Sequence, residues 1–214
     1  MVLGGSPQRL TPLALAAVFV AALPLSYFGA HDRLTWWLET IPALIAFPLL
    51  ALTRKRWPLS GLLYLLILAH ALILLVGGHY TYALVPAGDW VRDWVGGARN
   101  NYDKLGHFAQ GFVPAILTRE LLVRYSPFRQ APRSAFLPIL MVAGPLAFSA
   151  LYEIIEWRVA VATGEAADAF LGTQGDVWDT QSDMLMALIG ALCAMILIPL
   201  HDRSLRRLQP PERA

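Results

Sequence analysis

The sequence predicts an all-α fold, a polytopic transmembrane helical bundle of about six spans. Two observations lead to this prediction. Hydrophobic residues make up 57% of the 214 residues and charged residues only 15%, whereas a soluble domain carries about 25% charged residues. The chain also contains six apolar runs, each close to the length of about 17 to 25 residues that a membrane-spanning helix needs. We therefore expect the lipid bilayer to surround most of the chain.

The expected spans follow one another along a single domain, residues 1–207, and the tail 208–214 is expected to be disordered because it carries two prolines and mixed charges. The first run is longer than the apolar core of a signal peptide, so we predict a retained helix. Prolines inside the runs predict kinks, because neighbouring helices can satisfy the freed carbonyls. The runs are Thr11 to Phe28, Trp36 to Leu52, Leu59 to Val76, Leu105 to Val123, Ala135 to Trp157 and Thr180 to Leu200.

The distribution of Lys and Arg predicts that both termini face the cytoplasm, because cytoplasmic loops carry an excess of these residues. With six spans and a cytoplasmic N-terminus, the inner segments hold twelve Lys and Arg residues and the outer segments hold five. The longest outer connection contains Trp90, Val91, Trp94 and Val95 at helical spacing. This spacing predicts either an interfacial amphipathic turn or an aromatic belt at the membrane surface.

Composition and motifs exclude several functional classes. The only cysteine, Cys193, cannot form an intramolecular disulfide or a thiolate metal site. The net charge of +2 is far from the basic load of a nucleic-acid-binding protein, so we expect no nucleic-acid partner. The signatures of P-loop proteins, serine hydrolases with a nucleophile elbow and zinc peptidases are absent. An unusual enzyme is not excluded by this absence.

One polar constellation stands out near the last three predicted spans. It consists of six carboxylates together with His107 and Lys104. In the N-in, C-in orientation, all of these side chains fall at the extracytoplasmic ends of the helices. Each pair at i,i+3 or i,i+4 spacing projects from one face of its helix. The carboxylates are Asp103, Glu153, Glu156, Asp176, Asp179 and Asp183.

Charged groups inside a span are expensive, at about 2.5 to 3.5 kcal/mol each at the helix centre, and usually face the bundle interior. Six neighbouring acids would also repel one another, so unless some are protonated they need a cation. Oxygen ligands with one imidazole suit Mg²⁺, Mn²⁺ or, less well, Zn²⁺. If the site is catalytic, His107 or Glu156 would carry the proton. The predicted metal ligands are Asp103, His107, Glu153, Glu156, Asp176, Asp179 and Asp183.

Simpler roles compete with this interpretation. Asp103 and either Asp176 or Asp179 could be helix N-caps. Lys104 could extend towards water, and His107 could hydrogen-bond to a neighbouring helix. His70, in the third span, is interpreted as a packed polar residue.

Three motifs carry a resemblance to a known family: residues 101–108 (NYDKLGHF), 152–157 (YEIIEW) and 176–184 (DVWDTQSDM), with 79–82 (HYTY). Together they resemble the bacterial inner-membrane family typified by YjdF, a domain of unknown function. The resemblance covers most of the chain and implies a multi-pass protein of the bacterial inner membrane. It implies no activity.

A remoter similarity links the chain to the VanZ-like proteins, which are associated with glycopeptide-antibiotic resistance. Asp103, Lys104, His107, Glu153 and Asp183 approach their pattern, whereas Glu156, Asp176 and Asp179 depart from it. Three hypotheses follow. The cluster binds a divalent cation and, through it, a phosphate-bearing or lipid-linked envelope ligand; or it is a proton or cation relay of a transporter; or it stabilises a non-catalytic scaffold.

Overall fold

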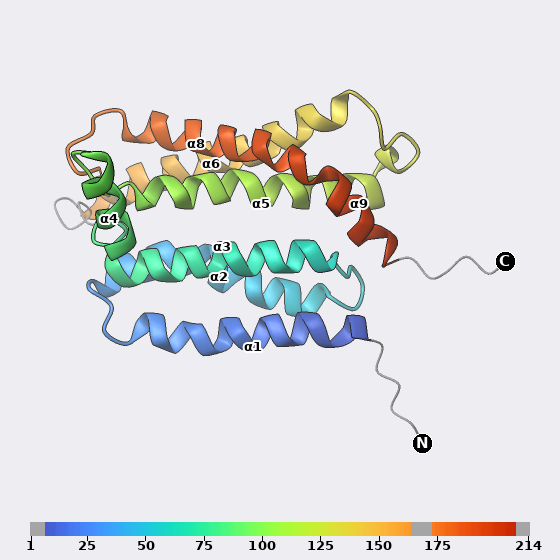
Figure 1. The fold of residues 1–214 in the computed structure, drawn as a ribbon, viewed down its shortest axis with the longest axis horizontal. Helices are drawn as coiled ribbons and strands as arrows, with labels where there is room; N and C mark the ends of the chain where they lie inside the picture. Colours follow the sequence, from blue (N-terminus) through green and yellow to red (C-terminus); the bar gives the residue numbers. More distant parts are fainter. Residues whose placement is uncertain (1–6, 164–172, 209–214) are drawn as a thin grey trace, which may run out of the picture.

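The computed structural model describes residues 7–163 and 173–208, and the regular structure within them is helical. The predicted all-α class is therefore confirmed. Consecutive long helices alternate in direction, so that α8 runs parallel to α5, and the start of α1 and the end of α9 lie at the same end of the bundle (Figure 1). The helices are α1 (Pro7–Tyr27), α2 (Arg33–Thr53), α3 (Gly61–Tyr80), α4 (Pro86–Val95), α5 (Tyr102–Tyr125), η1 (Pro127–Arg129), α6 (Phe136–Thr163), α8 (Asp179–Ala194), η3 (Met195–Leu197) and α9 (Ile198–Arg206).

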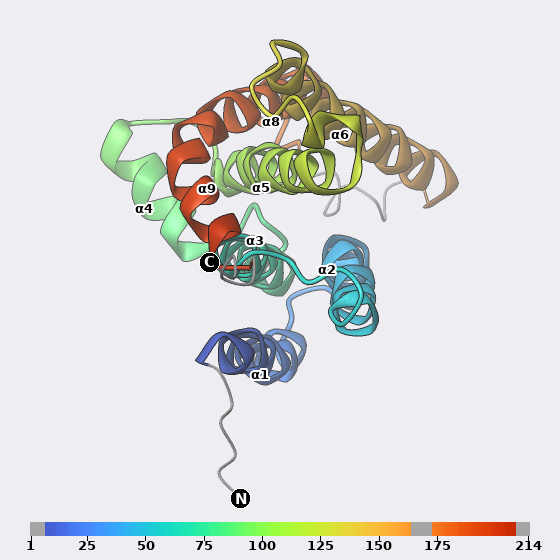
Figure 2. The ribbon, with the colours of Figure 1, turned by 90° about the vertical axis from the view of Figure 1, so that its right-hand side faces the viewer.

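Four helical stretches in this part of the chain are long and apolar enough to cross a membrane: α2, α3, α6 and the continuous stretch Asp179–Arg206. Helix α1 contributes a shorter apolar stretch, Pro12–Tyr27, and α5 is not in this group. Helix α5 lies among α3, α6 and α8 (Figure 2). Because its neighbours cover it, α5 can carry polar side chains that a lipid-facing helix could not.

The outer surfaces of the bundle are apolar. Leu25, Leu52 and Ile196 are 76%, 81% and 79% exposed, and many other large apolar side chains remain uncovered. Exposed apolar surface of this extent is typical of membrane contact. The predicted amphipathic turn is a helix of ten residues, α4, at one end of the bundle. Its tryptophans, Trp90 and Trp94, are also exposed.

Two groups of helices make up the bundle. Figure 2 shows α1, α2 and α3 on one side and α5, α6 and α8 on the other. One apolar core, which includes Phe19, Trp36 and Leu75, lies within the first group. A second core, which includes Leu63 and Ile116, joins α3 to α5 and α8. Helix α3 therefore connects the two groups.

Helices α5 and α8 approach each other closely because small residues line their contact. A Cβ atom added to Gly111 would lie 1.8 Å from the carbonyl oxygen of Ala187, and one added to Gly190 would lie 2.1 Å from that of Phe108. Small residues of this kind let helix backbones meet in a membrane. Since α5 and α8 are parallel, this contact sets the first turn of α5 beside the first turn of α8.

The last predicted span changes direction near its end. Pro199 has no N–H group to donate to the preceding helical turn, and α8 passes through η3 into α9 at this point. Helix α9 then crosses the end of the bundle that carries both termini (Figures 1 and 2). The predicted disordered tail lies outside the described residues, apart from Leu208.

Candidate functional site

The acidic cluster lies at the end of the bundle opposite both termini. Helix α5 contributes Asp103 in its first turn, α6 contributes Glu153 and Glu156, and α8 contributes Asp179 and Asp183. All five side chains are buried. Asp176, in the turn before α8, is partly exposed, with 34% of its side chain accessible. Three segments distant in sequence therefore bring their carboxylates to one place.

Arg99, in the connection between α4 and α5, neutralises part of this cluster. One guanidinium nitrogen lies 2.7 Å from Asp179 Oδ1 and 3.3 Å from Asp176 Oδ2, and the other pairs with Asp103. Burial lowers the pKa of Arg99, but the hydrogen bond to Asp179 and the nearby carboxylate charges outweigh it and raise this pKa above its ordinary value. Arg99 is one of the five Lys and Arg residues of the predicted outer segments, and no sequence signal linked it to carboxylates in α5 and α8.

Lys104 neutralises the same cluster from the first turn of α5. Its Nζ atom lies 2.6 Å from Asp179 Oδ1, 2.8 Å from Asp183 Oδ1 and 3.5 Å from Asp103 Oδ2. Only 14% of its side chain is exposed, so the suggestion that Lys104 extends towards water is wrong. Two protein cations thus compensate the aspartates, which removes part of the reason for expecting a metal among them.

Helix capping does not explain Asp103 of α5 or Asp179 of α8. Asn101 precedes α5 and Trp178 precedes α8, and neither Asp103 nor Asp179 occupies a cap position. Asp176 instead accepts a hydrogen bond of 2.9 Å from the backbone N–H of Trp178 and so shapes the turn that enters α8.

Asn100 holds the connection that carries Arg99. Its side-chain amide donates to Val85 O at 2.9 Å and to Asp89 Oδ1 at 3.0 Å, which attaches the connection to α4. Gln174 forms two hydrogen bonds with the backbone of Asn100, of 3.0 and 2.7 Å, which attach it to the turn before α8. A Cβ atom on Gly88 would lie 1.8 Å from Asn100 Oδ1. Only glycine therefore leaves room for Asn100 to position Arg99.

A second group consists of His107, Glu153 and Asp183. Lys104 compensates Asp183, whereas Glu153 has no Lys or Arg within ion-pair distance among the described residues. The Nδ1 atom of His107 lies 3.7 Å from Glu153 Oε1, and Nε2 lies 3.7 Å from Asp183 Oδ1. Glu153 Oε1 is buried without a hydrogen-bond partner among the described residues. One ligand atom from each of the three side chains lies within 4.8 Å of the others.

Gln110 orients the imidazole of this group. His107 Nδ1 lies 2.9 Å from Gln110 Oε1, and an amide oxygen can only accept. The proton is therefore on Nδ1, and Nε2 keeps its lone pair on the side of Asp183. A hydrogen bond that fixes the ring nitrogen opposite the ligating one is typical of metal-binding histidines.

A small cavity of about 50 Å³ lies between the two helix groups, next to His107 and Asp183. It is lined by polar residues from both groups, among them Glu39 and His70 from α2 and α3 and His107, Gln110 and Glu156 from α5 and α6. Glu39 was not among the predicted site residues, although a lone carboxylate in an apolar run was a usable signal. His70 was predicted to be a packed polar residue, whereas the structure places it on the same cavity as His107.

Comparison with known proteins agrees with this architecture. The family model described as "Predicted membrane protein (DUF2238)" matches residues 11–203. The chain is 54% identical over 204 residues to the inner membrane protein YjdF of Escherichia coli (strain K12), which covers 94% of this chain and 96% of the relative. No solved structure matches. The predicted location in the bacterial inner membrane is confirmed, and the similarity to VanZ-like proteins stays a prediction. The chain belongs to the DUF2238 family of predicted membrane proteins.

Proposed function

We propose that His107, Glu153 and Asp183 bind a divalent cation at the end of the bundle opposite the termini. The observation that carries this proposal is the buried Glu153 Oε1 atom, which has no hydrogen-bond partner in the described part of the chain and faces His107 at 3.7 Å. An unpaired carboxylate oxygen in such a place is costly. A cation held by two carboxylates and one imidazole would satisfy it, and this donor set suits Mg²⁺, Mn²⁺ or Zn²⁺.

The distribution of charge supports the same conclusion. Arg99 and Lys104 lie against the aspartates, whereas Glu39, Glu153 and Glu156 have no Lys or Arg within ion-pair distance among residues 7–163 and 173–208. These glutamates must either hold protons or share a bound cation. We therefore narrow the expected metal ligands from seven residues to three, and assign the remaining aspartates to Arg99 and Lys104.

A phosphate-bearing or lipid-linked envelope molecule is the proposed ligand of this centre. A divalent cation polarises a phosphoryl oxygen or activates a bound water, and the site lies at the end of the bundle, where a lipid headgroup can reach it. If a reaction occurs, Glu156 is the proposed proton carrier, because it is buried on the cavity next to Glu153 and is not needed as a ligand.

A second candidate function is a proton or cation relay. The cavity supports it, because Glu39 and His70 extend the polar lining from the cluster into the first helix group. Ionisable groups inside membrane helices commonly mark ion pathways. This function would use Glu39, Glu153 and Glu156 as protonated carboxyl groups instead of metal ligands.

Metal analysis tests the proposed centre. We expect the detergent-purified protein to retain about one divalent ion per chain after dialysis, and we expect Glu153→Gln to lose it with little change in side-chain shape. Asp93→Asn is the matched control, because Asp93 is exposed on α4 and pairs only with Arg92 among the described residues. Elemental analysis of the three proteins measures the effect. Wild-type protein without metal would refute the centre, and proton flux in proteoliposomes that depends on Glu39 would then favour the relay.

We also propose that six helices span the membrane with both termini in the cytoplasm. Both termini lie at one end of the bundle (Figure 1), and the excess of Lys and Arg at that end supports this orientation. With Cys193 replaced by serine, Asp93→Cys should react with an impermeant maleimide on intact spheroplasts. Arg129→Cys should react only after permeabilisation. The reverse labelling pattern would overturn the orientation and would place the acidic cluster in the cytoplasm.

A further inference from the structure

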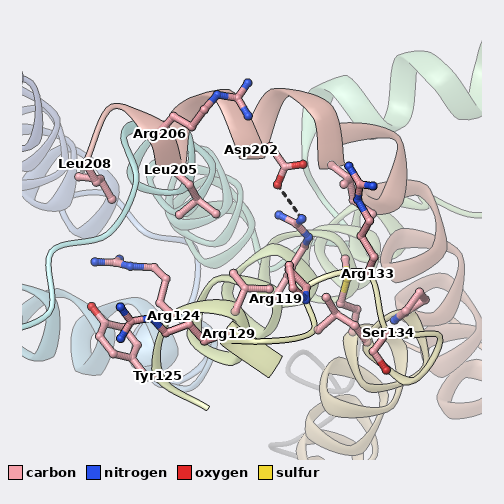
Figure 3. Close-up of a pocket in the computed structure, with 16 residues that line it drawn as sticks. Arg119, Arg124, Tyr125, Arg129, Arg133, Ser134, Asp202, Leu205, Arg206 and Leu208 are labelled. Atoms are coloured by element: carbon pink, nitrogen blue, oxygen red, sulfur yellow. Dashed lines mark hydrogen bonds and ion pairs between the residues drawn. The ribbon is translucent and has the colours of Figure 1, made fainter. Parts of the chain in front are cut away.

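A second polar site lies at the opposite end of the bundle, beside the termini. Helices α5, α6 and α9 and the connection 126–135 enclose a pocket of about 890 Å³ (Figure 3). Its inner wall is apolar and includes Leu137 and Met141 of α6, both buried. The pocket exists because α9 turns across the end of the bundle after Pro199 instead of continuing the line of α8.

The pocket is strongly basic. Among the described residues, one carboxylate lines the pocket, that of Asp202, and it is already bound to Arg119 of α5 at 2.6 Å. Arg124 pairs with Glu120, behind the pocket, at 2.8 Å. Arg129, Arg133 and Arg206 have no carboxylate partner within the described residues. The lining arginines are Arg119, Arg124, Arg129, Arg133 and Arg206.

Arg119 is built into the protein interior. It is 4% exposed, and its side chain reaches from α5 to Asp202 on α9 (Figure 3). Another nitrogen of its guanidinium lies 2.9 Å from His201 Nδ1, and His201 Nε2 lies 2.9 Å from Glu120 Oε2. Because a guanidinium can only donate, His201 Nδ1 accepts and Nε2 donates to Glu120. Arg119 is thereby fixed in one orientation at the pocket wall.

Membrane orientation alone does not account for this arrangement. Arginines that only set topology need to lie in a loop, whereas Arg119 is buried inside a helix and tied to Glu120 through His201. Its Nε atom is also buried and has no hydrogen-bond partner in the described part of the chain. An unpaired buried donor at the wall of a pocket that three further arginines line favours the binding of an anion there.

We propose that this pocket binds a phosphate-bearing anion. Arginine presents several donors in a planar fork that matches phosphate oxygens, and basic pockets between membrane helices bind phospholipid headgroups. The apolar wall accommodates the carbon skeleton next to the phosphate. A lipid headgroup and a soluble phosphate ester share this chemistry. The site is separate from the acidic cluster and does not depend on the function proposed for it.

Calorimetric titration of the full chain in detergent tests the proposal. The probes are inorganic phosphate, a water-soluble short-chain phosphatidylglycerol, and the corresponding phosphatidylcholine as a probe without net charge. We expect the double variant Arg133→Gln, Arg206→Gln to bind the anionic probe at least tenfold more weakly, because two positive charges are removed and the loss of even one charge-assisted hydrogen bond weakens binding about tenfold. Both side chains are exposed, so the fold should tolerate the change.

The matched control is Arg54→Gln, Arg56→Gln, which removes two exposed arginines from the connection between α2 and α3, outside the pocket. Tight binding of phosphatidylglycerol alone would identify a lipid headgroup, and displacement of it by inorganic phosphate would identify a soluble phosphate ester. Both results support the pocket. Equal binding of the anionic probe by wild type and pocket variant, or an equal loss in the control variant, would overturn the proposal.

Discussion

Replacing Lys104 with methionine will destabilise the protein by about 3 kcal/mol, because it removes one charge from a buried network and leaves Asp183 without a Lys or Arg partner among the described residues. Lys104 Nζ lies within 2.8 Å of both Asp179 and Asp183, and the two aspartate side chains are 8% and 4% exposed. Methionine fills a similar volume, so the loss reports charge and not packing. Thermal unfolding in detergent, followed by circular dichroism, measures the effect.

A second substitution distinguishes charge from a general loss of structure. In the Lys104→Met background, Asp183→Asn should restore part of the lost stability, because it removes the carboxylate that Lys104 alone compensates among the described residues, whereas Asp179 keeps its pair with Arg99. Lys55→Met is the control for lysine removal, since Lys55 is exposed in the connection between α2 and α3, and it should leave the melting temperature unchanged. Equal melting temperatures for Lys104→Met and wild type would show that the aspartates do not depend on Lys104.

Replacing Gly190 with valine will separate α5 from α8 and destroy the acidic cluster. The added Cβ atom would lie 2.1 Å from the carbonyl oxygen of Phe108, and a backbone atom cannot move aside as a flexible side chain can. Overpacking in a closely packed core costs about 1 to 3 kcal/mol or more, and here two helices must shift. We expect an aggregated or strongly destabilised protein, measured by the monodisperse fraction in size-exclusion chromatography.

The control for this substitution is Gly61→Val at the start of α3, where an added Cβ atom meets nothing within 4 Å. Both variants add the same β-branched residue to a helix, so helix propensity affects them similarly. A Gly190→Val protein as stable as Gly61→Val would mean that α5 and α8 do not pack as closely as described.

Apolar run length determines the helical class without reference to tertiary contacts, because a bilayer requires internally hydrogen-bonded segments of a minimum length. Helix spacing likewise places His107 one turn after Asp103 and Glu156 on the face of Glu153. Both inferences depend only on properties of single segments. Helix α5 shows where such inferences end. It was predicted as a span, but its mean hydropathy is lower than that of the four apolar spans. It can be polar because α3, α6 and α8 pack around it.

Pairing across segments was decided by the tertiary structure alone. The sequence contains Arg99, Lys104 and six neighbouring acids. Nothing in it shows that the two cations compensate the aspartates, or that Glu153 Oε1 has no hydrogen-bond partner among the described residues. Nor does it show that Glu39 and His70 face the cavity. The physical reason is that local pattern specifies which face of each helix is polar, whereas helix packing, set here by Gly111 and Gly190, determines which polar faces meet.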